Sequence, residues 1–102
     1  SRLTPNTLDN NNDNDIINNI ITDTTGDGIY IAGSSSTGNY IANNTIYQAS
    51  QYGIYVTGSD YNEITQNNIT DSGNRGIYLY NYADYNNVTA NYLYSTDHRA
   101  ID

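Results

Sequence analysis

A unit of about 24 residues recurs along this 102-residue chain, and the repeat restricts what the chain can fold into. Its shared frame is N-x-I-x-x-N-x-I, then six residues, then G-I-Y and an aliphatic residue. Self-similarity at a period of about 20–50 residues is typical of solenoids, propellers and repeat arrays. We therefore predict four structural repeats, preceded by a partial N-terminal coil or linking segment at residues 1–13. The four repeats are residues 14–38, 39–61, 62–85 and 86–102.

Within each repeat the apolar residues alternate with a period of two, which indicates β-strands. In G-I-Y-I, for example, Ile29 and Ile31 would point inward and Tyr30 outward. β-branched and aromatic residues suit a pleated sheet. The helical spacing of i, i+3, i+4 and i+7 does not run through any repeat. The sequence predicts about three short strands per repeat, joined by turns rich in Asn and Gly.

Alignment of the repeats produces four columns of aliphatic residues, as expected when each repeat forms one coil and the coils stack at ~4.8 Å. The columns are Ile16, Ile41, Ile64 and Val88; Ile21, Ile46, Ile69 and Leu93; Ile29, Ile54, Ile77 and Ile101; and Ile31, Val56 and Leu79. A small-residue column, Gly28, Gly53, Gly76 and Ala100, marks a corner where a side chain would collide with the opposite wall. The fold class predicted is all-β: a single-stranded parallel β-helix of about four coils.

Asparagine forms two further columns, Asn14, Asn39, Asn62 and Asn86, and Asn19, Asn44, Asn67 and Asn91. Asn tolerates the left-handed backbone of tight turns. Stacked amides can also hydrogen-bond from one coil to the next, as they do in cross-β ladders. We interpret both columns as structural ladders because they persist through every repeat; ligand binding is the alternative.

This frame resembles the parallel β-helix repeat of the carbohydrate-binding and sugar-hydrolase superfamily. It is most similar to the Asn-rich type of the periplasmic copper-protein maturation family and of archaeal surface proteins. The resemblance covers about residues 14–102 and rests on core and turn positions. It implies a right-handed coil and an extracellular or cell-surface setting, and it brings no catalytic residue with it.

Charge and composition exclude several classes of function. The net charge is -8 and the chain has no Lys, so the basic surface that nucleic-acid binding requires is missing. No apolar run approaches the ~18 residues of a membrane span. There is no Cys, so thiolate and disulfide chemistry cannot occur. The acidity would suit Ca²⁺, yet no calcium-binding motif is present, and we predict no metal site and no other cofactor.

The sequence offers no convincing catalytic constellation, and we expect the protein not to be an enzyme. Asp60 and Asp84 lie in corresponding loops and could stack, but a solvated loop face explains them. Asp97-His98-Arg99 holds the only His and faintly resembles the Asp-His signature of alginate epimerases, without its Pro. Arg75 and Arg99 align in one column, where an anionic ligand or nearby Asp residues could hold the two charges.

Tyr30, Tyr55 and Tyr78 form an outward column between two aliphatic columns. Such rings could stack on the sugars of a polysaccharide. The interpretation we favour is a ladder in which each ring packs on the next coil, because stacked aromatic pairs contribute ~0.5–1.5 kcal/mol beyond burial.

Three N-x-[ST] sequons agree with a location outside the cytoplasm. They begin at Asn43, Asn68 and Asn87. In a chain so rich in Asn and Thr, sequons also arise by chance.

The ends of the stack are the best candidate for a functional surface. Leu8 is expected in the column of Ile31, while Leu93 and Ile101 belong to the last repeat, which shows no capping helix. Repeat arrays need polar caps to stay soluble, and unpaired strand edges invite pairing with another chain. We expect the ends to be covered by identical chains stacked head to tail, or by the rest of a longer protein.

The function predicted is therefore an extracellular structural β-helix that assembles end to end into a filament, sheath or surface layer. A carbohydrate-binding module, or a fragment of a polysaccharide-active enzyme, is the alternative. A segment of a phage tail fibre is a third.

Overall fold

Strands of three or four residues alternate with turns through the part of the chain that the structure describes. The computed structural model describes residues 6–9, 12–94 and 100–102, and these contain twelve strands and no helix. The first three repeats contribute three strands each, as the alternating apolar pattern predicts, and the described part of the fourth contributes two. Between strands, Asn, Gly and other polar residues take up the turns, several of them with a left-handed backbone.

The strands pair in parallel and form three sheets of four strands each, in which neighbours come from successive repeats. The first sheet contains β1 (Asn6–Asp9), β4 (Ile29–Ala32), β7 (Ile54–Thr57) and β10 (Ile77–Tyr80). The second contains β2 (Asp15–Ile17), β5 (Tyr40–Ala42), β8 (Glu63–Thr65) and β11 (Asn87–Thr89). The third contains β3 (Ile20–Thr22), β6 (Thr45–Tyr47), β9 (Asn68–Thr70) and β12 (Tyr92–Tyr94).

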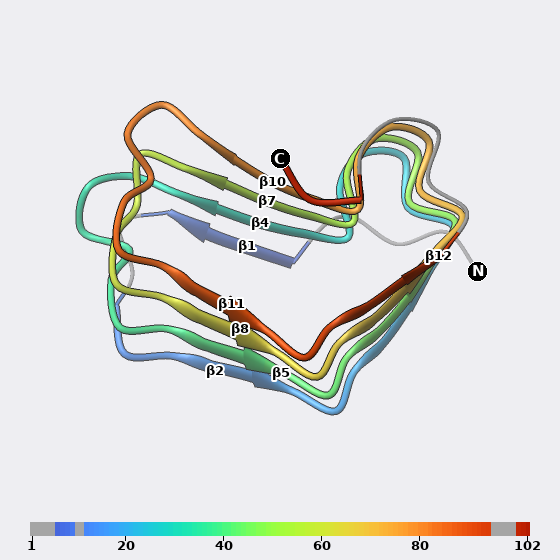
Figure 1. Ribbon diagram of the computed structural model, residues 1–102, viewed down its shortest axis with the longest axis horizontal. Helices are drawn as coiled ribbons and strands as arrows, with labels where there is room; N and C mark the ends of the chain where they lie inside the picture. Colours follow the sequence, from blue (N-terminus) through green and yellow to red (C-terminus); the bar gives the residue numbers. More distant parts are fainter. Residues whose placement is uncertain (1–5, 10–11, 95–99) are drawn as a thin grey trace.

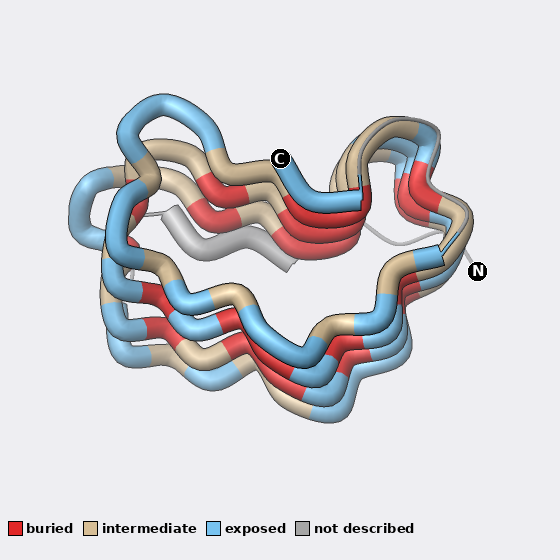
Figure 2. The backbone as a smooth tube through the Cα atoms, viewed as in Figure 1, coloured by how far each residue is buried: buried red, intermediate tan, exposed pale blue. Residues whose placement is uncertain are grey.

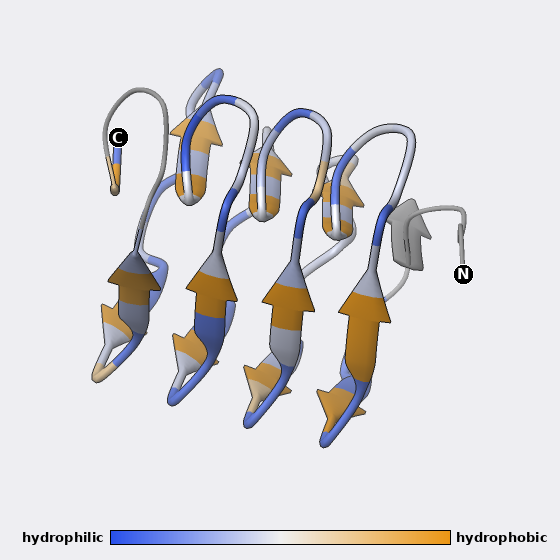
Figure 3. Ribbon diagram, turned by 90° about the vertical axis from the view of Figure 1, so that its right-hand side faces the viewer, coloured by the Kyte–Doolittle hydropathy of each residue, from blue (hydrophilic) through white to orange (hydrophobic). Residues whose placement is uncertain are grey.

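The chain winds through the three sheets as a right-handed parallel β-helix. In Figure 1 it runs counter-clockwise from β2 through the lower corner to β4 while it advances toward the viewer. Figure 3 shows the coils side by side, with apolar strands aligned from one coil to the next. The structure has about three complete turns, each with a strand in every sheet. The predicted four coils correspond to these turns plus a partial last one formed by β11, β12 and a bridge at Ile101.

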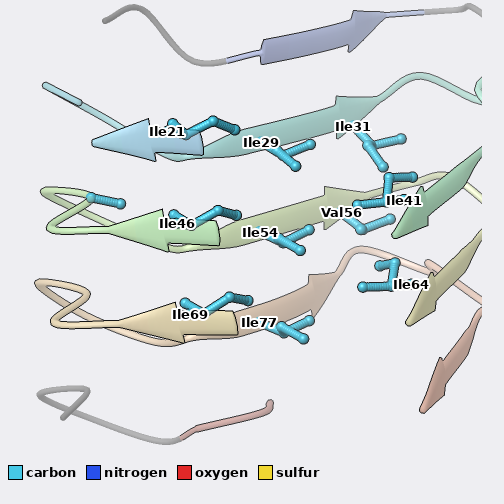
Figure 4. Close-up of a cluster of buried hydrophobic side chains, with 11 residues drawn as sticks. Ile21, Ile29, Ile31, Ile41, Ile46, Ile54, Val56, Ile64, Ile69 and Ile77 are labelled. Atoms are coloured by element: carbon cyan, nitrogen blue, oxygen red, sulfur yellow. The ribbon is translucent and has the colours of Figure 1, made fainter. Parts of the chain in front are cut away.

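The aliphatic columns of the sequence are the core of the coil. Strand register places Ile16 beside Ile41, Ile21 beside Ile46, and Ile29 beside Ile54. In the middle coils these side chains are completely buried, and Figure 4 shows them stacked between the sheets. Backbone register also sets Leu8 of β1 opposite Ile31, the column expected for it. Burial of these columns is the main apolar driving force for folding.

A glycine column turns the corner before the first sheet, where the inward-facing Ile side chains leave no room for a Cβ. A Cβ on Gly28 would lie 2.6 Å from the carbonyl oxygen of Gly53 and 2.6 Å from Cγ2 of Ile46. Neither contact is tolerable for a real Cβ, and one of the two partners is rigid backbone. The small-residue column is therefore required by coil stacking, as predicted.

The two Asn columns are continuous hydrogen-bonded ladders. The Oδ1 of Asn67 accepts from the backbone N–H of Asn44 at 3.0 Å and from its Nδ2 at 2.9 Å. Asn67 repeats both donations to Oδ1 of Asn91, at 2.9 Å each. Its second Nδ2 hydrogen goes to the carbonyl of Ile41 at 3.0 Å. The amide thus uses both of its donors and both acceptor sites of its oxygen.

The parallel ladder from Asn14 runs the same way: Asn39 donates its backbone N–H to Asn62 at 3.0 Å and its Nδ2 to the same oxygen at 2.9 Å. Asn39, Asn44, Asn62 and Asn67 are each about 1% exposed. Amides that are buried and already occupied have nothing left for a ligand. The structural interpretation of the two columns is confirmed.

Replacement of one ladder residue tests this account. Asn67→Ala leaves two buried N–H groups of Asn44 without an acceptor and removes two donations from residue 67 itself. Since each buried orphan costs about 1–3 kcal/mol, we expect a loss of roughly 3 kcal/mol or more in the free energy of unfolding, measured by urea denaturation. Asn68→Ala, at the neighbouring exposed position, should change it by less than about 0.5 kcal/mol. Equal effects of the two variants would contradict the ladder's role.

Candidate functional site

The tyrosine column lies on the outer face of the first sheet, where register sets Tyr30 beside Tyr55 and Tyr55 beside Tyr78. The ring centroids of Tyr30 and Tyr55 are 5.4 Å apart, and those of Tyr55 and Tyr78 are 5.3 Å apart, at interplanar angles of 26° and 10°. The three rings are stacked on one another from coil to coil. This geometry is the ladder predicted from the sequence.

Two tyrosines that the sequence argument missed complete this cluster. Tyr52, from the turn before β7, leans its ring on both Tyr55 and Tyr78, with centroids 4.9 Å away in each case. Tyr80 lies 5.5 Å from Tyr78 along the same strand. Strand alternation could have found Tyr80, because it is the next outward residue of β10. Nothing in the sequence reports the direction of a turn side chain such as Tyr52.

The central ring of the cluster is neutral at physiological pH. Burial raises the pKa of the Tyr55 phenol, against a smaller opposing effect of its hydrogen bond with Thr57. Its neighbours Tyr30 and Tyr78 stack on it from the two adjacent coils, so all three rings of the column are only partly exposed. The first sheet therefore carries an uncharged aromatic wall.

Arg75 is held by protein groups at one end of this wall. Its Nε donates to Oδ2 of Asp102 at 2.6 Å, and its guanidinium carbon lies 4.5 Å from the centre of the Tyr78 ring. The sequence left an anionic ligand or a nearby Asp as the partner of the Arg column, and the structure places an Asp beside Arg75. Arg99 and His98 lie outside the residues that the structure describes.

Asp27 occupies the same column two coils before Arg75 and is half-buried. Its Oδ1 accepts from the backbone N–H of Tyr52 at 3.1 Å. Burial raises the pKa of the Asp27 carboxyl, and the hydrogen bond from Tyr52 opposes the shift without cancelling it. The charged form of Asp27 is therefore disfavoured by the folded coil.

The last coil exposes apolar groups that are buried in every middle coil. Val88 and Leu93 are half-buried, and Ile101 is 48% exposed although its column neighbour Ile77 is 0% exposed. Figure 2 shows the same change as the red interior of the middle coils gives way to tan and pale blue in the front coil. β11 and β12 are also the edge strands of their sheets. This surface, made by Val88, Leu93, Ile101 and the two strand edges, is called the last-coil face below.

The Asn ladders give the coil two chemically different ends. In the first three repeats each ladder Asn donates its backbone N–H to Oδ1 of the corresponding Asn in the next coil. At the last-coil face no described residue accepts from the backbone N–H of Asn86 or Asn91. At the other end no described residue donates to Oδ1 of Asn14 or Asn19. One end thus offers donors and the other acceptors.

The three sequons lie at exposed positions. Asn43 is in a turn with a left-handed backbone, while Asn68 and Asn87 begin β9 and β11 with outward side chains. All three are sterically accessible to a modifying enzyme. Their glycosylation stays a prediction.

Over residues 4–101 the chain matches the family model described as periplasmic copper-binding protein (NosD). The chain belongs to this family. The match and the parallel coil agree with the β-helix family suspected from the repeat. No curated protein and no solved structure matches the chain.

The NosD description names copper, and the side chains of this chain can be compared with the ligands that copper favours. Soft thiolate and thioether ligands favour Cu(I), and imidazole suits both copper states. The sequence has no Cys, no Met and a single His. Among the described residues no three His, Cys, Asp or Glu side chains lie close enough together to hold a metal ion. A separate finding for the same residues is that no helix is long and apolar enough to cross a membrane. The residues present do not fit a copper centre, and we derive no step through copper.

The half-buried carboxyl of Asp27 makes a pH-dependent prediction. Because its folded pKa is raised above the unfolded value, its contribution to stability is present at low pH and is lost as the pH rises through the folded pKa. Asp27→Asn keeps an oxygen for the Tyr52 N–H and removes the buried charge. We expect this variant to have a higher urea midpoint than the parent at pH 7 and a similar one at pH 3.

The matched control is Asp15→Asn, which makes the same charge change at an exposed position of β2. If the effect came only from a lower net negative charge, the urea midpoints of both variants would rise equally at pH 7. That outcome would contradict a specific effect of burial at Asp27.

Proposed function

We propose that this NosD-family chain is a structural, non-enzymatic β-helix outside the cytoplasm, and that its coils stack end to end with those of a second copy. Repetition of this contact would build a filament, sheath or surface layer. The observation that carries the proposal is the last-coil face, where open strand edges, exposed core columns and ladder donors occur together.

Apolar burial supports a coil as the partner of this face. Val88, Leu93 and Ile101 continue columns whose members in the middle coils are fully buried by the coils on either side. Each aliphatic side chain that becomes buried contributes about 1.5–3 kcal/mol. A surface of regular columns is matched best by another set of the same columns.

Hydrogen bonding supports a head-to-tail direction. Asn86 and Asn91 present N–H donors at the last-coil face, while Asn14 and Asn19 present Oδ1 acceptors at the opposite end. Stacked head to tail, two copies would continue the ladders with the geometry seen inside each chain. Stacked head to head, they would bring donors against donors. The direction follows from the polarity of the rungs.

The family supports the location. NosD is described as periplasmic, which agrees with the surface setting that the repeat and the sequons suggest. Coils of the same polypeptide, if it is longer, would cover the last-coil face through the same contacts. The proposal for a second copy concerns the chain of residues 1–102.

Sedimentation velocity across a range of protein concentrations tests the proposal. The expected result is a series of growing species, with filaments or sheets in negative-stain electron micrographs. Asn91→Asp keeps the acceptor for Asn67, adds a charge at the contact and removes Nδ2, which has one hydrogen on the Ile64 carbonyl at 3.0 Å and the other left for a partner. We expect it to weaken association about tenfold or more.

Asn68→Asp is the control, because it adds the same charge to an exposed wall position of the preceding coil. It should assemble like the parent chain. A parent chain that remains monomeric at millimolar concentration would overturn the proposal.

Polysaccharide binding is the second candidate, and the aromatic wall of Tyr30, Tyr55 and Tyr78 with Tyr80 favours it. Aromatic faces stack on sugar rings, but the inner rings here already stack on one another. The two candidates differ in solution. A glycan-binding module would be retained by acidic polysaccharide, would lose retention with Tyr55→Ala and Arg75→Ala, and would stay monomeric.

A further inference from the structure

A second pair of stacked tyrosines lies away from the aromatic wall, in the loops that lead into β8 and β11. The centroids of Tyr61 and Tyr85 are 5.2 Å apart, and the rings are nearly parallel at 8°. Tyr61 is 63% exposed and Tyr85 is 76% exposed. In the wall, by contrast, the rings of Tyr30, Tyr55 and Tyr78 are only partly exposed. These loops lie along the left edge of Figure 1, on the side of the coil and away from the core.

The backbone does not favour tyrosine at these two positions. Tyr61 and Tyr85 have φ values of 60° and 57°, in the left-handed region. Corresponding residues in the earlier coils are Asp13 and Gly38, with φ values of 55° and 70°. Gly and Asp accept this conformation more readily than a bulky aromatic residue does. The turn itself needs no aromatic ring, so the ring is present for another reason.

Each of the two tyrosines directly follows an aspartate. The backbone N–H of Asp84 donates to Oδ1 of Asp60 at 2.7 Å, which joins the two loops across the coils. Two stacked rings and two carboxyl groups therefore share one corner of the coil, here named the Tyr61–Tyr85 corner. A polar surface that combines aromatic faces with negative charge attracts organic cations.

The protein itself shows which cation this combination accepts. Arg75 places its guanidinium 4.5 Å from the Tyr78 ring centre while its Nε donates to Asp102. A ring face and an aspartate together hold one guanidinium there. Arg75 is the only Lys or Arg among the described residues, so the Tyr61–Tyr85 corner has no described cation of its own.

We propose that the Tyr61–Tyr85 corner binds an arginine side chain of a partner protein. The guanidinium would lie on an exposed ring face and donate to the carboxyl group of Asp60 or Asp84. Arginine is preferred to lysine because its planar group stacks on a ring and presents a fork of donors to a carboxylate. The net charge of -8 adds a long-range attraction for such a partner. The Tyr61–Tyr85 corner is a different surface from the last-coil face, which Val88, Leu93, Ile101 and the edges of β11 and β12 form.

The test uses two fluorescent hexapeptides with three cationic residues each, one with Arg and one with Lys, at physiological salt. Because their charge is equal, the ratio of their dissociation constants removes the contribution of net charge and reports the preference for the planar guanidinium. We expect the intact chain to bind the Arg peptide at least about threefold more tightly. The double variant Tyr61→Gly/Tyr85→Gly should lower this ratio to near one, because the ring faces are lost, and should remain folded by circular dichroism, because Gly38 already occupies the same turn position.

The role of the carboxyl groups is tested by comparing Asp84→Asn with Asp15→Asn, which makes the same charge change at an exposed position of β2 in the second sheet. We expect the first to weaken binding of the Arg peptide at least threefold more than the second. Equal affinity of the two peptides for the intact chain would overturn the proposal. So would an Arg preference that survives in the double glycine variant. Retention of a neutral polysaccharide that the double variant loses, without any Arg preference, would overturn it in favour of a sugar.

Discussion

This structure depends on the hydrogen bonds that each buried Asn amide makes to the neighbouring coils. Asn67 uses both amide hydrogens and both acceptor sites of its oxygen inside the coil, so it can be neither removed cheaply nor diverted to a ligand. A parallel stack built this way has one geometry, because each rung fixes the spacing and direction of the next. The aliphatic columns stabilise the coil and oppose a one-residue slip of a strand, which would turn their side chains outward. The ladders oppose any shift as well, since a displaced amide would leave buried polar groups without partners.

Most of the fold was predictable because equivalent residues of successive repeats lie next to each other in adjacent coils. Alignment of the repeats predicts the core columns, the glycine corner and both Asn ladders. Strand register confirms the columns, the space at Gly28 and Gly53 confirms the corner, and hydrogen bonds between coils confirm the ladders. Contacts that break the repeat were not predictable. The ring of Tyr52 leans across two coils from a turn, and Asp102 reaches Arg75 from the last coil. Both depend on side-chain directions in turns, where the period of two no longer applies.

The candidate sites show the same division. The stacked column of Tyr30, Tyr55 and Tyr78 follows from strand alternation, and the structure confirms it as a ladder. The pair of Tyr61 and Tyr85 was recoverable in principle, because both directly precede the opening Asn of a repeat. It was overlooked because that position looks like a turn, where Gly38 stands in the earlier repeat. Only the left-handed φ values show that tyrosine is an unusual choice there.

Membership in the NosD family describes the fold of this chain and does not by itself supply the side chains for copper binding. The family match rests on the repeat, whose recurring residues are core, corner and ladder positions in every coil. The described residues hold no group of His, Cys, Asp and Glu side chains that could bind a metal, and the chain lacks the sulfur ligands that copper favours. We therefore assign the proposed contacts to two places outside the buried positions of the repeat: the loops that carry Tyr61 and Tyr85, and the last coil, whose columns are less buried than those of the middle coils.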